Sequence, residues 1–263
     1  MKIIFITGAS TGLGKATAKL FASKGWNVIA TMRHPDKELS KIKNITVMQL
    51  DVTNLEQINK VVKEATKKDI DVVFNNAGYG MTGPFEAATD EEIQKLVNTN
   101  LLGVMRVTKA FIPYFRERKK GIFITTTSIG GHVSFPLNSV YNASKWALEG
   151  WCESLTYELS EFNIMVKTVA PGGMSTEFSK SIVMTEHKAY KALEKILNVF
   201  KGKRVQLGFT TPEEVAMVVY EAATDNKKKL RYIAGKDAKM IYAFRRWAGD
   251  RIFMWQIRRS FLR

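Results

Sequence analysis

Two residues in the middle of the chain, Tyr141 and Lys145, have the types and spacing of an acid–base pair. They lie four positions apart in the stretch YNASK, so on a helix they share one face. An ammonium beside a phenol favours the phenolate, which would lower the tyrosine pKa from about 10 towards neutrality and suit it to general acid or base chemistry. Alone the spacing is a weak signal, because such pairs are usually surface neighbours.

A glycine-rich stretch near the start, ITGASTGLGK, places Gly8, Gly12 and Gly14 within seven residues. The glycines follow the apolar run 3–6, which predicts a strand, and precede apolar residues at helical spacing. A tight turn from strand into helix exposes backbone N–H groups at the positive end of the helix, where a phosphate binds. The alternative is a glycine-rich loop that holds no ligand.

The elements that must position these residues alternate along the chain. Apolar runs predict strands at 3–6, 27–31, 45–50, 70–74, 121–127 and 164–170. Helical patterns cover 54–67, 89–115 and 141–160, and a capping sequence at Thr211-Pro212-Glu213-Glu214 begins another helix. This alternation predicts an α/β fold with a doubly wound parallel sheet flanked by helices. Ligands then bind beyond the carboxyl ends of the strands, where the glycine turn lies.

Composition limits the class of protein. A chain of 263 residues is long enough for one large α/β domain, and 45% hydrophobic residues without a run of about 18 apolar positions predict a soluble protein. The apolar opening is too short for a signal peptide. A lone Cys152 cannot form an internal disulfide, which fits a reducing cytoplasm, and within a predicted helix it is expected to be a packed thiol.

Further motifs accompany the first two. Asn75-Asn76-Ala77-Gly78 ends the fourth predicted strand, Asn98-Thr99-Asn100 lies in the next helix, and Ser128, at the end of the fifth strand, precedes Tyr141 by thirteen residues. Pro171-Gly172 and Thr176 follow the sixth strand. With these elements in order, residues 1–235 resemble the short-chain dehydrogenase/reductase superfamily in its single-domain form, which has a Rossmann-type fold.

The resemblance implies hydride transfer between a nicotinamide ring and a carbonyl or alcohol carbon. Tyr141 would give its proton to the carbonyl oxygen, and Ser128 would hydrogen-bond that oxygen. Lys145 would hold the nicotinamide ribose hydroxyls, and Asn100 would position a water that links Lys145 to solvent. The alternative is a cofactor-binding regulator or sensor on the same fold, but such regulators commonly lack the tyrosine or the lysine, and both are present here.

The resemblance also implies a cofactor site, with the pyrophosphate at the glycine turn and the adenine beside Asp51-Val52. The predicted cofactor-binding residues are Gly8, Ser10, Thr11, Gly12, Leu13, Gly14, Arg33, Asp51, Val52, Asn76, Ala77, Gly78, Tyr141, Lys145, Pro171, Gly172 and Thr176.

The end of the second predicted strand favours NADP(H) over NAD(H). NAD enzymes of this fold usually place an acidic residue there for the adenosine ribose hydroxyls, whereas this chain has Met32 followed by Arg33. A guanidinium suits a 2′-phosphate, which it can grip with two hydrogen bonds. Thr11 weakens the preference, because many NADP-dependent relatives carry a basic residue at that motif position.

The segment 176–210 corresponds to the substrate lid of the family. Its apolar side chains include Ile182, Val183, Met184, Leu193, Ile196, Leu197, Val199 and Phe200. They predict a lipophilic ketone, aldehyde or secondary alcohol as substrate, and the chain is similar to bacterial relatives of hydroxysteroid and retinol dehydrogenases. The alternative is that these side chains pack the lid onto the body. His34, His132 and His187 are scattered and are expected to be surface or loop residues, with no metal site.

The basic character is concentrated at the C-terminus. Residues 227–263 hold twelve Lys or Arg and two Asp, a net charge of +10 within a total of +15. In the segment 236–263 arginines interleave with apolar residues at helical spacing, namely Met240, Ile241, Phe244, Trp247, Phe253, Ile257 and Phe261. This tail is expected to make a peripheral contact with a membrane or hydrophobic partner, and not to bind nucleic acid. The alternative is that the stripe covers the substrate cleft or a homo-oligomer interface.

Overall fold

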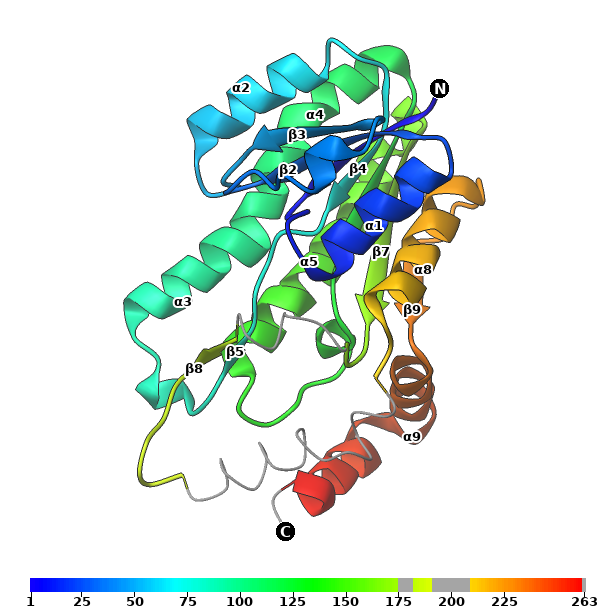
Figure 1. Ribbon diagram of the computed structural model, residues 1–263. Helices are drawn as coiled ribbons and strands as arrows, with labels where there is room; N and C mark the ends of the chain where they lie inside the picture. Colours follow the sequence, from blue (N-terminus) through cyan, green and yellow to red (C-terminus); the bar gives the residue numbers. More distant parts are fainter. Residues whose placement is uncertain (175–181, 191–208, 262–263) are drawn as a thin grey trace.

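The computed structural model describes residues 1–174, 182–190 and 209–261. Its centre is a parallel sheet of seven strands in the order β3-β2-β1-β4-β6-β7-β9 (Figure 1). The strands are β1 (Ile3–Thr7), β2 (Asn27–Met32), β3 (Ile45–Gln49), β4 (Ile70–Asn75), β6 (Gly121–Thr126), β7 (Ile164–Pro171) and β9 (Arg231–Ala234). Since β1 pairs with both β2 and β4, the direction of strand order reverses at β1, which is where this architecture binds ligands.

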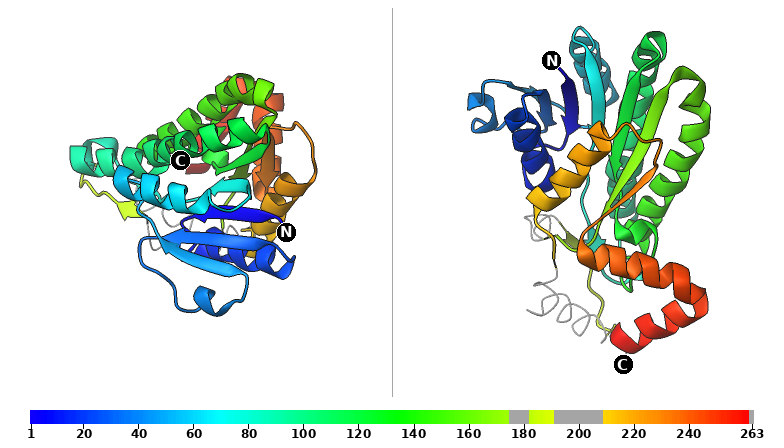
Figure 2. Two further views of the ribbon diagram at one scale, coloured as in Figure 1. Left: turned by 90° about the horizontal axis from the view of Figure 1, so that it is seen from above. Right: turned by 90° about the vertical axis from the view of Figure 1, so that its right-hand side faces the viewer.

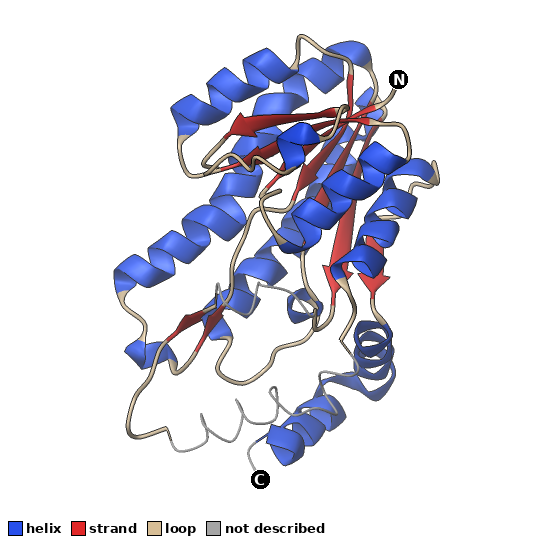
Figure 3. Ribbon diagram, viewed as in Figure 1, coloured by secondary structure: helices blue, strands red, loops and turns tan. Residues whose placement is uncertain are grey.

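Helices cover both faces of the sheet (Figures 2 and 3). One layer contains α1 (Gly12–Ser23) and α8 (Pro212–Thr224), and the other contains α2 (Leu55–Ala65), α4 (Val104–Arg118) and α5 (Ser139–Leu159). Strand β1 is buried along its whole length, with Ile4 and Ile6 in the first core and Ile3 and Phe5 in the second. Burial on both faces explains why the central strands are continuous apolar runs.

The predicted helix 89–115 is interrupted. It consists of α3 (Asp90–Val97), a π-helical turn (Asn98–Gly103) and α4. A π-helical turn shifts the register of the backbone hydrogen bonds and is frequent at functional sites. Thr211 forms the predicted capping box with Glu214 at the start of α8.

Two features were not predicted from the sequence. Strand β9 extends the sheet beyond β7, and a two-stranded parallel sheet pairs β5 (Met81–Thr82) with β8 (Val183–Met184). Strand β8 belongs to the predicted lid 176–210, and the rest of that lid falls largely outside the described residues, as does Thr176.

The C-terminal tail is helical. Helix α9 (Lys236–Phe261) is kinked at Gly249, whose φ of 68° lies in the left-handed region. None of the helices in the described ranges is both long enough and apolar enough to cross a membrane.

Candidate active site

Three of the four predicted catalytic residues meet where β6 ends and α5 begins. Ser128 follows β6, and its hydroxyl is hydrogen-bonded to that of Tyr141. One turn further along α5, the Lys145 Nζ lies 5.8 Å from the centroid of the Tyr141 ring. The helix places both side chains on the same face, as the spacing predicts.

Lys145 is a buried cation with a fixed partner. Its Nζ donates a hydrogen bond of 3.0 Å to the carbonyl oxygen of Thr126, the last residue of β6, and the residue is only 6% exposed. Burial lowers the pKa of Lys145 to about 8, against the opposing effect of the Glu149 carboxylate. The lysine therefore titrates just above neutrality.

The predicted lowering of the Tyr141 pKa is wrong for the protein in this structure. Burial raises the pKa of Tyr141, and the hydrogen bond with Ser128 opposes that rise only in part. The physical reason is that burial of the Tyr141 hydroxyl disfavours the charged phenolate, while the hydrogen bond of Lys145 Nζ goes to the Thr126 carbonyl. At neutral pH Tyr141 is thus protonated, which is the form that donates a proton.

Asn100 lies in the π-helical turn and is almost completely buried. Its Oδ1 accepts from the Tyr79 backbone N–H at 3.0 Å, and its Nδ2 donates to the Tyr79 carbonyl at 2.8 Å. A Cβ on Gly78 would lie 3.0 Å from Asn100 Oδ1 and 4.0 Å from Lys145 Nζ, so Gly78 is where the two side chains approach each other. The water-positioning role of Asn100 stays a prediction.

The glycine turn is constrained by its neighbours. Gly8 and Gly12 have φ angles of 66° and 52°, in the region that favours glycine. A Cβ on Gly14 would lie 2.2 Å from the Gly8 oxygen, and one on Gly8 would lie 2.7 Å from the Ala77 Cα. Thr11 is the N-cap of α1 but makes no side-chain cap hydrogen bond, so the first N–H groups of this helix have no such partner.

Asn76 ties the turn to the neighbouring strand. Its Nδ2 donates to the carbonyl oxygens of Thr7, at 3.2 Å, and Gly8, at 3.0 Å. The Thr7 hydroxyl accepts from the backbone N–H groups of Asn76 and Ala77. The predicted cofactor residues after β1 and β4 are therefore brought together, and the Asn76 side chain positions the turn. Leu13, by contrast, directs its side chain into the core.

The other predicted cofactor residues line the same edge of the sheet. Met32 ends β2 and is buried, and the Arg33 that follows is exposed. Val52 is buried beside the π-helical turn, where a Cβ on Gly103 would lie 2.8 Å from it, and Asp51 next to it accepts hydrogen bonds from Thr53.

Ser10 is half-buried in the glycine turn. Pro171 ends β7, and the Gly172 N–H donates to the Ala234 carbonyl of β9.

A family comparison agrees with this arrangement. Residues 2–187 match the model of a family described as short chain dehydrogenase. The chain belongs to the short-chain dehydrogenase family. Membership makes it an NAD(P)-dependent oxidoreductase that acts on CH–OH or C=O groups.

Relatives of this short-chain dehydrogenase match over most of its length. An uncharacterized oxidoreductase of Schizosaccharomyces pombe is 38% identical over 85% of this chain and 96% of its own. A 3-ketodihydrosphingosine reductase of Bacteroides thetaiotaomicron is 39% identical over 70% of this chain and 68% of its own.

Solved structures agree as well. A short-chain dehydrogenase from Streptomyces avermitilis superposes with a TM-score of 0.84 at 32% identity, covering 94% of this chain and 92% of that one. The ElxO protein with NADP bound has a TM-score of 0.73 at 25% identity, covering 88% and 97%.

A buried charge cluster behind the catalytic helix of this short-chain dehydrogenase was not predicted. Glu149, one turn after Lys145, is 3% exposed. Its Oε2 lies 3.0 Å from Arg231 Nε, and its Oε1 lies 3.2 Å from His132 Nε2. His132 follows a short helical turn, as a loop residue should, but its side chain is largely enclosed and not on the surface. His34 and His187 are exposed.

The sequence holds no local signal for this cluster, because His132 and Arg231 lie far from Glu149 along the chain. Cys152, on the same helix, is buried as expected, and burial raises the pKa of its thiol to about 12.

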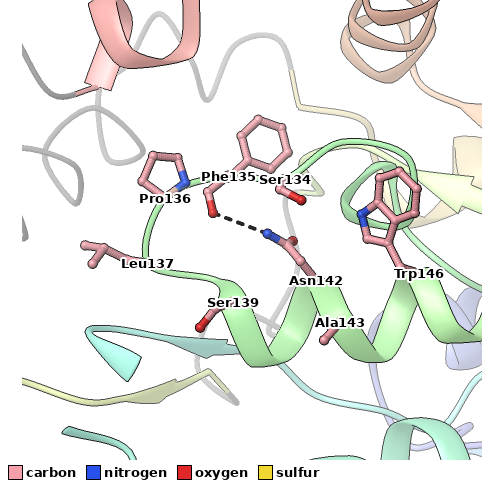
Figure 4. A pocket seen from close by; sticks show the side chains of 8 residues that line it. All are labelled: Ser134, Phe135, Pro136, Leu137, Ser139, Asn142, Ala143 and Trp146. Atoms are coloured by element: carbon pink, nitrogen blue, oxygen red, sulfur yellow. Dashed lines mark hydrogen bonds between the residues drawn. The ribbon is translucent and has the colours of Figure 1, made fainter. Parts of the chain in front are cut away.

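A pocket of about 520 Å³ lies between the loop before α5 and the first turns of that helix (Figure 4). It is lined by Ser134, Phe135, Pro136, Leu137, Ser139, Asn142, Ala143 and Trp146. Four of these residues, Ser139, Asn142, Ala143 and Trp146, belong to α5. At about 100° per residue, their side chains leave the helix roughly 100° to 200° around its axis from that of Tyr141. We therefore do not count this pocket as part of the candidate active site.

Proposed function

We propose that the protein is an NADP(H)-dependent reductase that converts a lipophilic ketone or aldehyde to the alcohol. The observation that carries this proposal is the Tyr141 hydroxyl, hydrogen-bonded to Ser128 and with the Lys145 Nζ over the same ring. A phenol, a second hydroxyl and a cation at one point suit a carbonyl oxygen that gains negative charge.

In this proposal the bound nicotinamide supplies the hydride, and the protein supplies the proton and the positioning. Tyr141 donates its proton to the substrate oxygen, and Ser128 hydrogen-bonds the same oxygen. Lys145 holds the ribose hydroxyls of the cofactor, and Asn100 orders the water through which the proton is replaced.

The glycine turn fits the pyrophosphate of such a cofactor. The N-terminus of α1 offers first-turn N–H groups without a side-chain cap, whereas α3 and α8 begin with complete capping boxes. Side chains at Gly8 or Gly14 would collide with neighbouring backbone, so the turn stays narrow and its backbone can approach a phosphate.

The surroundings of Arg33 support NADP(H). The two carboxylates in the loop after β2, Asp36 and Glu38, are engaged by Lys15 at 2.9 Å and 2.7 Å. Arg33 is exposed at the end of β2 and forms no ion pair with another described residue. A 2′-phosphate would give that guanidinium an anionic partner.

We expect Arg33→Ala to raise the KM for NADPH by about 10- to 100-fold, the typical value of a hydrogen bond to a charged group. The KM for NADH should change less than about threefold, because NADH has no 2′-phosphate. Steady-state kinetics with both cofactors measures this, with Lys41→Ala, another exposed cation in the same connection, as the matched control. Equal effects on the two cofactors would refute the assignment.

The pH dependence of reduction follows from the two buried groups. Lys145, with its pKa lowered to about 8, is cationic below that pH and neutral above it, whereas the raised pKa of Tyr141 keeps the phenol protonated throughout. We expect kcat/KM for reduction to be level near pH 7 and to fall above about pH 8, since this ratio reports the free enzyme. A rate that rises through that range would show that the neutral lysine is the active form.

Two observations support a lipophilic substrate. One relative is named as a 3-ketodihydrosphingosine reductase. In the described part of the lid, Val183 of β8 pairs with Met81 of β5 and packs in an apolar cluster with Leu96 and Val140. Val140 directly precedes Tyr141 on α5, so this apolar cluster packs on the helical turn that carries the catalytic tyrosine.

The experiment is a panel of carbonyl compounds assayed by NADPH oxidation with quantification of the alcohol. Aliphatic, aromatic, steroid and sugar carbonyls should be compared at equal concentration. We expect the highest kcat/KM for apolar ketones or aldehydes. A strict preference for small polar sugars would refute the lipophilic assignment while leaving the reductase assignment intact.

A further inference from the structure

Helix α9 lies at the end of the molecule opposite α2 and the N-terminus (Figures 1 and 2). It follows β9 directly, and its Asp237 carboxylate accepts from the Gly173 backbone N–H at 2.9 Å. The start of the helix is thus fixed to the carboxyl edge of the sheet.

One face of α9 is covered by the protein itself. Phe253 is buried, and Ile241, Phe244 and Ile257 are half-buried in a cluster with Ile129 and Val133, while Phe261 contacts Phe135. These residues make up most of the apolar stripe predicted from the sequence. For these residues an outward contact with a membrane or partner is wrong, because they pack on the protein's own body. Cover of the substrate cleft or of a subunit interface stays a prediction.

The outer face carries a second set of apolar side chains. Trp247 is 82% exposed, and Ile252 and Trp255 are each 52% exposed. At about 100° per residue, positions 252 and 255 lie on the side of the helix away from 253 and 257. Ile252 and Trp255 therefore share the exposed side of the helical segment after the kink at Gly249, whereas Trp247 lies on the segment before it. Large apolar groups exposed together mark an interaction site.

Cations surround these exposed apolar groups. Arg251, Arg258 and Arg259 are exposed, and the Arg259 guanidinium lies 5.4 Å from the Trp255 ring centroid. The two carboxylates of α9 are engaged elsewhere, since Asp237 binds backbone and Asp250 pairs with Arg245 at 2.7 Å. The outer face is therefore apolar and positively charged.

We propose that the outer face of α9, defined by Arg251, Ile252, Trp255, Arg258 and Arg259, docks the protein on an anionic phospholipid bilayer. Tryptophan and isoleucine enter the interfacial zone, and the arginines bind lipid phosphates and carboxylates. The contact is peripheral, with the helix lying in the plane of the surface.

Charge and side-chain chemistry select this occupant. A second copy of the protein would bring the same arginines face to face across a symmetric interface, which is repulsive. A nucleic acid would satisfy the arginines but leave the exposed Ile252 without an apolar partner, because it offers base stacking and phosphates. A bilayer surface satisfies both kinds of group.

The test is co-sedimentation of the full-length protein with vesicles of phosphatidylcholine, with and without phosphatidylserine, at low salt. We expect binding to the phosphatidylserine vesicles. Because each cation near an anionic surface contributes about fivefold to partitioning, the triple variant R251Q/R258Q/R259Q should bind about a hundredfold more weakly. The matched control K60Q/K63Q/K68Q, on and beside α2, changes the net charge equally and should bind within about twofold of the unmodified protein.

A second readout separates insertion from simple charge attraction. Lipids brominated in their acyl chains should quench tryptophan fluorescence in the unmodified protein, and W255F should lose most of that quenching. The proposal is overturned if the control and the arginine variant lose binding equally, or if no quenching occurs. It is also overturned if the unmodified protein does not bind vesicles and is an oligomer that the arginine substitutions dissociate. Binding to duplex DNA without binding to vesicles would overturn it as well.

Discussion

Replacing Tyr141 by Phe is expected to lower kcat/KM for carbonyl reduction by about 10³-fold, within the usual range for loss of a general acid. The substitution removes only the hydroxyl, which is hydrogen-bonded to Ser128 and carries the proton to be donated. The ring and its contact with Lys145 remain, so the dissociation constant for NADPH should change little. Steady-state kinetics and NADPH titration by fluorescence measure the two quantities.

Tyr157→Phe is the matched control, because Tyr157 lies on the same helix and is 72% exposed. It should leave both kcat/KM and NADPH affinity unchanged. If Tyr141→Phe reduced an accepted substrate at the normal rate, another group would have to supply the proton and the assigned mechanism would be wrong.

Lys145→Met should also lower kcat/KM by about 10³-fold, because it removes the cation beside the reacting oxygen and the proposed anchor of the cofactor ribose. Unlike Tyr141→Phe, it should raise the KM for NADPH by about 10-fold, the value of a hydrogen bond between charged and polar groups. This difference between the two variants separates proton donation from cofactor binding.

The stability of Lys145→Met provides a check on this interpretation. Methionine fills a similar volume without the cost of a buried charge, so the midpoint of thermal unfolding should not fall markedly. Lys109→Met, at an exposed position on α4, is the control for the substitution itself. Unchanged kcat/KM and unchanged NADPH binding in Lys145→Met would remove this residue from the site.

The fold was largely predictable because the central strands are buried on both faces. Such strands appear in the sequence as continuous apolar runs, and all six that were predicted are present. Strand β9 was missed because it is short and begins with Arg231, whose charge is satisfied by Glu149 across the structure. The π-helical turn at Asn98–Gly103 has no local signal, since its residues also fit a continuous helix.

The site was predictable in its positions but not in its electrostatics. Motif order placed Ser128, Tyr141 and Lys145, and the structure brings them together. Whether the Tyr141 pKa is raised or lowered depends on the burial of its hydroxyl and on the hydrogen bond between Lys145 and the Thr126 carbonyl. The four-residue spacing of Tyr141 and Lys145 predicts neither. In α9, periodicity identified most of the inner apolar stripe but also placed the exposed Met240 and Trp247 in it. It missed Ile252 and Trp255, which lie on the other side of the helical segment after Gly249.

The most direct measurement of the central claim is the transfer of deuterium from NADPH labelled at C4 of the nicotinamide to a carbonyl substrate. NADPH carries two hydrogens at C4, and each can be replaced by deuterium separately. We expect one of the two labelled epimers to give one deuterium on the carbinol carbon for each NADPH consumed, and the other epimer to give none. Tight NADPH binding without turnover of any carbonyl in the panel would contradict the claim and show a cofactor-binding regulator on this fold.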